Sequence, residues 1–231
     1  MSTAVVPQKS SRRRRARKRA RQKSVDRRMV LVAVLLLAGL LSAVYFLARG
    51  EGARIITDPQ IARIAGLEVP DWVDQQILPE DSDSRRGDLL EACNAVVIHY
   101  VGNPGTTAEQ NRNYYGNPGT KVNSHFLVGL DGEIIQSIPL EEKSSATSER
   151  NRDTISIEVC HPDEEGKFTE ASYDSVVRLT AWLMDACQLE GEDALIRHYD
   201  ATGKECPIYY VKNESAWLQL KADVEAARQS N

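Results

Sequence analysis

An uninterrupted apolar segment divides this chain and limits which of its residues can fold as a water-soluble unit. Residues 29–48 carry no charged side chain, and a helix needs about 20 such residues to cross the hydrocarbon core of a membrane. Arg27 and Arg28 precede the segment, and Arg49 follows it. A cleaved signal peptide is the alternative, but its apolar region is typically about 7–15 residues long and ends at a small-residue cleavage site, which is not evident here. The sequence therefore predicts one transmembrane helix over residues 29–48.

The net charge changes sign across this segment. Residues 1–28 hold 12 Lys or Arg and one Asp, a local charge of +11, whereas the other 203 residues sum to −15. Basic residues before a membrane helix favour a cytoplasmic N-terminus, which places the acidic part of the chain outside. A basic tail could also bind nucleic acid, but its position beside a membrane helix favours a role in topology and contact with anionic lipid headgroups. We therefore expect a basic cytoplasmic tail, a single-pass anchor and no nucleic-acid partner.

A change of pattern after the predicted helix separates a connecting region from a folded domain. Residues 49–92 are predicted to be a linker and an N-terminal arm, and residues 93–231 to be the domain. Asp131-Gly132 between two apolar runs is a strong hairpin signal. The predicted strands are residues 94–100, 124–130, 133–139, 154–160 and 194–199, and the predicted helices are residues 107–115, residues 169–189 and a last one from about residue 213. This alternation predicts an α/β fold in which a mixed central sheet is flanked by helices.

Two candidate metal ligands lie close together near the C-terminus, and a third lies at the end of a predicted strand. His198 and Cys206 are eight residues apart, with Lys204 between them, and His99 ends the apolar run 95–100. Imidazole nitrogen and thiolate sulfur are zinc ligands, and a catalytic zinc site keeps one position open for water. We therefore predict that His99, His198 and Cys206 bind zinc. Lys204 and Cys206 would point the same way in an extended segment.

Glu158 is an acidic residue within an otherwise apolar strand, predicted over residues 154–160. A buried carboxylate is unfavourable unless it is paired, hydrogen-bonded or functional. The structural alternative is an ion pair with an arginine such as Arg152 or Arg197. In the functional interpretation, Glu158 takes the proton from a zinc-activated water and passes it to a leaving nitrogen, while Lys204 stabilises the oxyanion. Together these groups suit hydrolysis of an amide.

The chain resembles the zinc-dependent N-acetylmuramoyl-L-alanine amidases of the type-2 amidase and peptidoglycan-recognition-protein superfamily. The resemblance covers residues 93–225, and four segments carry it: 97–100, 124–136, 154–160 and 198–207. By position, His99, His198 and Cys206 match the metal ligands of the family. Glu158 matches the acid that many bacterial members use as general base, and Lys204 matches a lysine assigned to the transition state. The resemblance implies a peptidoglycan-recognition-protein-like fold.

The implied activity is cleavage of the amide between the muramoyl lactyl group and L-alanine of peptidoglycan or muropeptides. With the predicted anchor, this implies an enzyme in a bacterial cell membrane whose catalytic domain is extracytoplasmic. The alternative is a non-catalytic module that binds or senses peptidoglycan. Family members of that kind typically lack the cysteine ligand, so the presence of Cys206 favours the enzyme.

Two departures from the family pattern concern the substrate cleft. Ser124 occupies a position where some members have a catalytic tyrosine, and residues 143–150 replace a segment in which many members have a histidine. Ser124, His125 and His161 are candidate substrate-binding residues. A hydrogen-bonded structural role is the alternative for His125, and His161 precedes a proline at a strand exit.

Overall fold

The computed structural model describes residues 56–230 of the chain. The basic tail and the transmembrane helix predicted over residues 1–28 and 29–48 lie outside these residues. Within residues 56–230, no helix is both long enough and apolar enough to traverse a bilayer.

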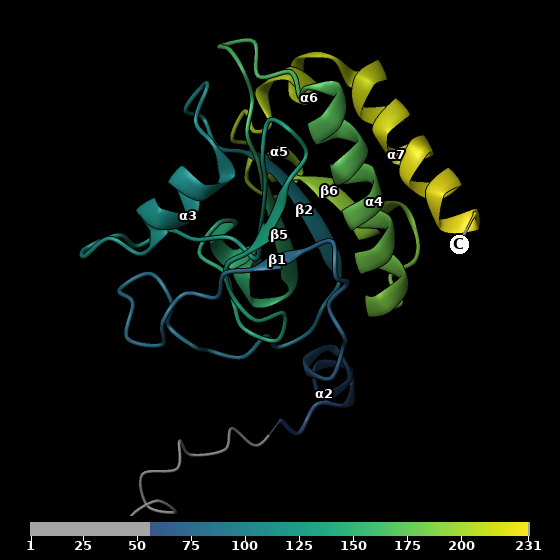
Figure 1. Ribbon diagram of the computed structural model, residues 1–231. Helices are drawn as coiled ribbons and strands as arrows, with labels where there is room; N and C mark the ends of the chain where they lie inside the picture. Colours follow the sequence, from purple (N-terminus) through teal and green to yellow (C-terminus); the bar gives the residue numbers. More distant parts are fainter. Residues whose placement is uncertain (1–55, 231) are drawn as a thin grey trace, which may run out of the picture. The chain divides into compact units, whose positions relative to one another are not determined.

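A six-stranded mixed sheet forms the centre of the fold (Figure 1). Its strands lie in the order β1-β4-β3-β5-β2-β6, and every neighbouring pair is parallel except β3 and β4. The strands are β1 Asp74–Gln75, β2 Ala95–Tyr100, β3 Phe126–Val128, β4 Ile134–Gln136, β5 Thr154–Val159 and β6 Leu195–Arg197. The mixed sheet predicted from the sequence is therefore confirmed.

The paired strands β2 and β5 determine which side chains face the site. They pair in parallel, and His99 lies opposite Glu158. Ile155 and Ile157 pack into the main hydrophobic core. Because side chains alternate along a strand, Glu158 points to the opposite face from these isoleucines, as the sequence predicts.

The β3–β4 hairpin turns at Asp131-Gly132, as the sequence predicts. Gly132 has φ +85°, a backbone conformation that favours glycine. A Cβ atom at this position would lie 2.8 Å from the carbonyl oxygen of Ala171. Glycine therefore allows the turn to pack closely against the start of the helix α4, Glu170–Cys187.

Helices cover both faces of the sheet (Figure 1). α4 and α7 lie side by side and bury the main core, whereas α3 packs with a smaller cluster that includes Leu127 on the other face. Val176, Leu179 and Leu183 of α4 are buried, as their helical spacing predicts. The α-helices are α2 Pro59–Ala65, α3 Ala108–Tyr115, α4 Glu170–Cys187, α5 His198–Thr202, α6 Ile208–Lys212 and α7 Glu214–Gln229, and the 3-10 helices are η1 Ser148–Arg152 and η2 Glu192–Ala194.

The residues before position 93 belong to the folded unit. α2, which the sequence pattern did not predict, buries Ile61 and Ile64, and β1 extends the sheet by pairing with β4. Leu78 is fully buried against the α3 face. The compact unit therefore includes residues from Ile56 onward.

Polar and aromatic contacts hold this N-terminal arm, residues 56–92, in place. The Trp72 ring meets Trp182 edge-on at 6.2 Å, and the Arg178 guanidinium lies 4.0 Å above Trp72. Arg85 donates two hydrogen bonds of 2.8 and 2.7 Å to the buried carboxylate of Glu142. The arm thus has specific contacts along its length and is more than a spacer.

Candidate metal centre and adjoining cleft

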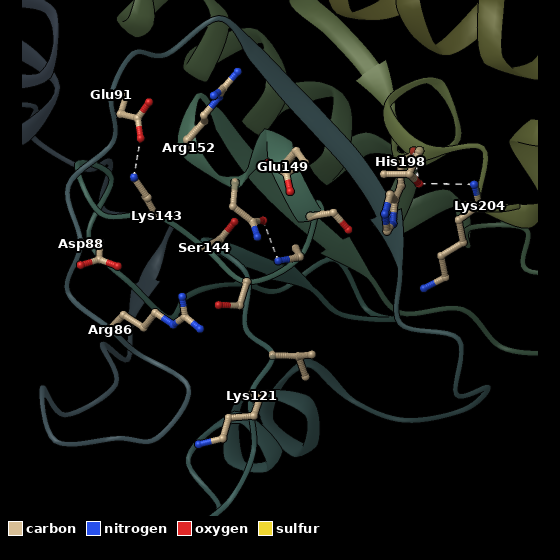
Figure 2. A pocket seen from close by; sticks show the side chains of 16 residues that line it. Arg86, Asp88, Glu91, Lys121, Lys143, Ser144, Glu149, Arg152, His198 and Lys204 are labelled. Carbon is tan, nitrogen blue, oxygen red and sulfur yellow. Dashed lines mark hydrogen bonds and ion pairs between the residues drawn. The ribbon is translucent and has the colours of Figure 1, made fainter.

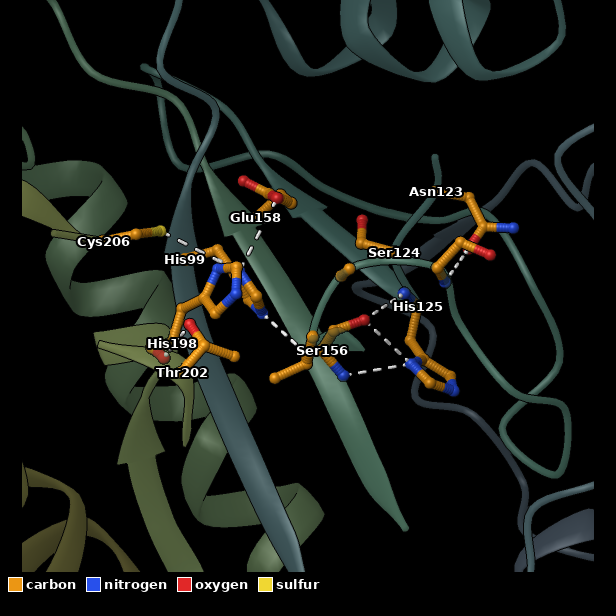
Figure 3. A network of polar contacts seen from close by, with 12 residues as sticks. His99, Asn123, Ser124, His125, Ser156, Glu158, His198, Thr202 and Cys206 are labelled. Atoms are coloured by element: carbon orange, nitrogen blue, oxygen red, sulfur yellow. Dashed lines mark hydrogen bonds and ion pairs between the residues drawn. The ribbon is translucent and has the colours of Figure 1, made fainter. Parts of the chain in front are cut away.

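The three predicted metal ligands converge at one point (Figure 3). His99, His198 and Cys206 are buried, and each offers a ligand atom within 4.8 Å of the other two. The Cys206 Sγ lies 3.9 Å from the His99 Nδ1, and the centroids of the two imidazole rings are 4.5 Å apart. Donor atoms at this spacing can share a single metal ion.

Neighbouring strand ends bring the two histidines together. His99 lies near the end of β2, and His198 directly follows β6, which pairs in parallel with β2. The short helix α5 then ends at Gly203, which has φ +79°. The chain turns back there, and Tyr199 N donates to the Cys206 carbonyl at 2.9 Å. This contact closes the loop and places Cys206 beside both histidines.

Ion pairs and hydrogen bonds made by Arg197 stabilise the loop that carries His198. Arg197 donates to Asp200 at 2.9 Å, to Glu214 at 2.6 Å and to the Tyr210 carbonyl at 2.9 Å. Its guanidinium also lies 5.2 Å from the ring centroid of Trp217. Arg197 is thus engaged away from Glu158, which argues against an Arg197–Glu158 structural ion pair.

The Glu158 carboxylate faces the three ligands. Its Oε1 lies 3.8 Å from the His99 Nδ1. Burial raises the pKa of Glu158 to about 8, and the nearby Lys204 ammonium opposes that rise. A metal cation at the ligand cluster would lower this pKa by direct attraction and favour the ionised carboxylate that a general base requires.

The residues present fit a zinc ion. The buried atoms His198 Nδ1 and Glu158 Oε2 have no hydrogen-bond partner within residues 56–230. Burial, reinforced by Lys204, lowers the pKa of both His99 and His198, which favours the neutral imidazole that can donate a lone pair to a metal. Burial raises the pKa of the Cys206 thiol to about 12, and a coordinated zinc would deprotonate it. Two nitrogens and one sulfur match a catalytic zinc site with an open position.

A cleft opens beside the ligand cluster (Figure 2). It consists of two hollows of about 900 and 450 Å³ that share His198 and Lys204. Glu158 lines the smaller hollow together with Tyr114 and Tyr115. The larger hollow is strongly charged, and its ionisable lining residues other than His198 and Lys204 are Arg86, Asp88, Glu91, Lys121, Lys143, Glu149 and Arg152. The reactive groups therefore border a space large enough for a peptide-sized substrate.

Lys204 reaches the cleft by a geometry that differs from the predicted one. Cys206 N donates to the Lys204 carbonyl at 2.6 Å, so residues 204–206 form a tight turn instead of an extended segment. Lys204 is exposed and lines both hollows, whereas Cys206 is buried. Lys204 thus lines the cleft and Cys206 lies in the ligand cluster, although the turn between them is not extended.

The structure places the three candidate substrate residues behind the cleft surface. Ser124 is fully buried and donates to the Phe126 carbonyl at 2.8 Å. Both ring nitrogens of the buried His125 have partners, with Nδ1 accepting from Ser156 N at 3.0 Å and Nε2 donating to the Glu142 carbonyl at 2.9 Å. This arrangement corresponds to the structural alternative for His125.

His161 is also buried, and its ring lies 4.9 Å from that of Tyr100, a residue of the cleft wall. Its Nδ1 donates to the Asp163 carbonyl at 2.7 Å. Sequence reasoning missed one residue that touches a ligand: the Thr147 Oγ1 lies 3.1 Å from the His99 Nε2. No spacing rule links two residues 48 positions apart, so only the folded structure identifies this contact.

The family model and the curated proteins that this chain matches all carry the description N-acetylmuramoyl-L-alanine amidase. A protein-family model described as N-acetylmuramoyl-L-alanine amidase (Amidase_2) matches residues 90–208. The chain is 28% identical over 172 residues to the N-acetylmuramoyl-L-alanine amidase BlyA of Bacillus subtilis (strain 168) and 25% identical over 162 residues to the N-acetylmuramoyl-L-alanine amidase CwlL of Bacillus licheniformis. These matches cover 64% and 62% of this chain but only 46% and 44% of the relatives. The chain therefore spans about half the length of these curated relatives.

Solved structures show the same similarity. The catalytic domain of XlyA superposes with a TM-score of 0.57 at 25% identity, over 66% of this chain and 98% of that structure. A mutant endolysin from Bacillus subtilis has the same TM-score at 26% identity, over 66% of this chain and 97% of its own. Both matches span nearly the whole of the other chain, so this chain includes the complete fold of those structures.

Proposed function

Because the chain belongs to the N-acetylmuramoyl-L-alanine amidase family, whose model matches 119 of its 231 residues, we propose that it is a zinc-dependent peptidoglycan amidase. The bond it cuts is the amide between the muramoyl lactyl group and L-alanine of the stem peptide. The observation that carries this proposal is the convergence of His99, His198 and Cys206 beside the Glu158 carboxylate in one cleft. Zinc held by such ligands lowers the pKa of a bound water to about 7.

The protein groups around the ligands supply the remaining steps. Glu158 accepts the proton released by the nucleophilic water and returns it to the amide nitrogen as the carbon–nitrogen bond breaks. The Lys204 ammonium, on the cleft wall shared by both hollows, stabilises negative charge that develops on the carbonyl oxygen. His99, His198 and Cys206 are the residues that would hold the zinc ion, the two histidines as neutral imidazoles.

A non-catalytic peptidoglycan sensor is the competing function. The test is to incubate the full-length protein in detergent micelles with a muropeptide of defined stem and to analyse the products by mass spectrometry. The amidase releases an intact stem peptide with a free L-alanine amine, and the two products together gain the mass of one water. Zinc-loaded, folded protein that binds peptidoglycan but leaves the muropeptide intact would establish the sensor instead.

The proposed location is a bacterial cell membrane, with the catalytic domain on the extracytoplasmic side. The uncharged segment 29–48 and the local charge of +11 before it support a single-pass anchor with a cytoplasmic N-terminus. Protease added to intact spheroplasts should digest the C-terminal domain and spare an epitope placed at the N-terminus. Protection of both ends would contradict this topology.

A further inference from the structure

The two ring nitrogens of His99 face different partners. Nδ1 points toward the metal centre, 3.9 Å from the Cys206 Sγ and 3.8 Å from the Glu158 Oε1. Nε2 lies 3.1 Å from the Thr147 Oγ1 on the other side of the ring. His99 is 1% exposed and Thr147 is 0% exposed, so water does not compete for the contact between the His99 Nε2 and the Thr147 Oγ1.

We propose that Thr147 is a positioning residue that holds His99 in the tautomer required for metal binding. A neutral imidazole carries its proton on one nitrogen and a lone pair on the other. When Nε2 donates to the Thr147 hydroxyl, the lone pair is on Nδ1, the atom that faces Cys206 and Glu158. The partner of the second nitrogen sets the tautomer and the ring orientation of a metal-bound histidine. This inference rests on the zinc centre of the proposed function.

Hydrogen bonds within the loop hold the backbone of Thr147 in place. The Asn151 Oδ1 accepts hydrogen bonds from Thr147 N at 2.6 Å and from Ala146 N at 3.0 Å. Ser148, the next residue, adopts φ +56°, which is unusual for a residue other than glycine. Arg150 N closes the turn by donating to the Thr147 carbonyl at 3.2 Å. Thr147 lies within residues 143–150, the segment that departs from the family pattern, and this loop therefore supports a metal ligand.

The test compares zinc affinities of full-length variants in detergent. Thr147→Val keeps the shape and removes the hydroxyl, whereas Thr147→Ser keeps the hydroxyl. Thr180→Val is the matched control, because Thr180 is also buried and its Oγ1 has no partner within residues 56–230. Competition with a chromogenic chelator should show about a 10–100-fold weaker zinc Kd for Thr147→Val, with values near wild type for the other two variants.

A second readout reports the tautomer without metal. Long-range proton–nitrogen correlation spectra of the zinc-free protein should show His99 protonated at Nε2 in the wild type and a mixture of tautomers in Thr147→Val. A lower melting temperature with an unchanged zinc Kd would overturn the positioning role and leave the metal centre intact. Failure of the wild type itself to bind zinc would overturn the metal centre, and this proposal with it.

Discussion

The His99 Nδ1 lies 3.8 Å from the Glu158 Oε1, because β2 and β5 pair in parallel with these two residues directly opposite each other. In-register pairing places a metal ligand and a carboxylate on the same face of the sheet. They belong to the neighbouring strands β2 and β5, whose side chains on the opposite face, such as Ile98 and Ile157, pack in the main core. The Glu158 carboxylate, the proposed proton acceptor, is therefore held beside the predicted metal ligands by two neighbouring strands.

Replacing Glu158 with Gln should abolish most turnover without releasing zinc. Glutamine has nearly the same shape but cannot accept the proton, and general acid–base catalysis contributes about 10²–10⁴-fold to rate. Product release from a defined muropeptide and zinc content should be measured on the same samples. Glu109→Gln, at an exposed position of α3, is the control and should retain full activity. Full activity of Glu158→Gln would assign the base to another group.

Replacing Lys204 with Met should lower kcat by about 10²–10³-fold, the effect expected on losing one oxyanion stabiliser. Zinc occupancy should be unchanged, because Lys204 supplies no ligand atom to the cluster. Lys212→Met removes an exposed lysine from α6 and should leave kcat unaltered. Equal kcat values for the two variants would exclude transition-state stabilisation by Lys204.

Replacing Ile64 with Ala should destabilise the domain by about 2–5 kcal/mol, the range for truncating a buried aliphatic side chain. Ile64 lies on α2 and is 1% exposed. Urea unfolding monitored by tryptophan fluorescence measures the loss. Leu218→Ala, at a position 58% exposed on α7, should change stability by less than about 0.5 kcal/mol. A similarly small effect at Ile64 would mean that the arm is not part of the cooperative unit.

His125 should make the domain less stable in acid. Burial lowers its pKa from 6.5 to about 4, so the unfolded chain takes up the proton first. The stability contributed by neutral His125 is complete above pH 6.5 and is lost as the pH falls toward about 4, with an upper limit of roughly 3 kcal/mol. Unfolding of zinc-free protein should therefore depend less on pH in His125→Gln than in wild type across this window. Identical pH slopes would contradict the assignment.

Much of the fold is encoded in local patterns. The apolar run of β2, the Asp131-Gly132 turn and the buried stripe of α4 each follow from spacing alone and are confirmed. α2 is only seven residues long, and a helix of that length is stabilised by packing more than by its own sequence. Its start is marked in the sequence by the N-cap Asp58 followed by Pro59, but the apolar pattern of Ile61 and Ile64 alone did not predict a helix.

The three residues predicted as metal ligands lie together in the structure, whereas Thr147, which contacts one of them, was not predicted. His99, His198 and Cys206 carry a chemical signature, because few residue types bind zinc. Thr147 carries none, because a threonine acquires a role here only through its contact with His99. The turn at residues 204–206 was also missed: Gly203 and Pro207 flank it, but the hydrogen bond from Cys206 N to the Lys204 carbonyl is seen only in the folded structure.

Zinc stoichiometry shows whether two imidazoles and one thiolate hold a single zinc ion. Elemental analysis of the purified full-length protein should give about one zinc per chain. Cys206→Ser should lose most of it, because a hydroxyl is a poor zinc ligand at neutral pH. Cys160→Ser, which removes a buried thiol outside the ligand cluster, should keep it. Zinc-free wild type after loading, or full zinc content in Cys206→Ser, would rule out a zinc centre built from His99, His198 and Cys206.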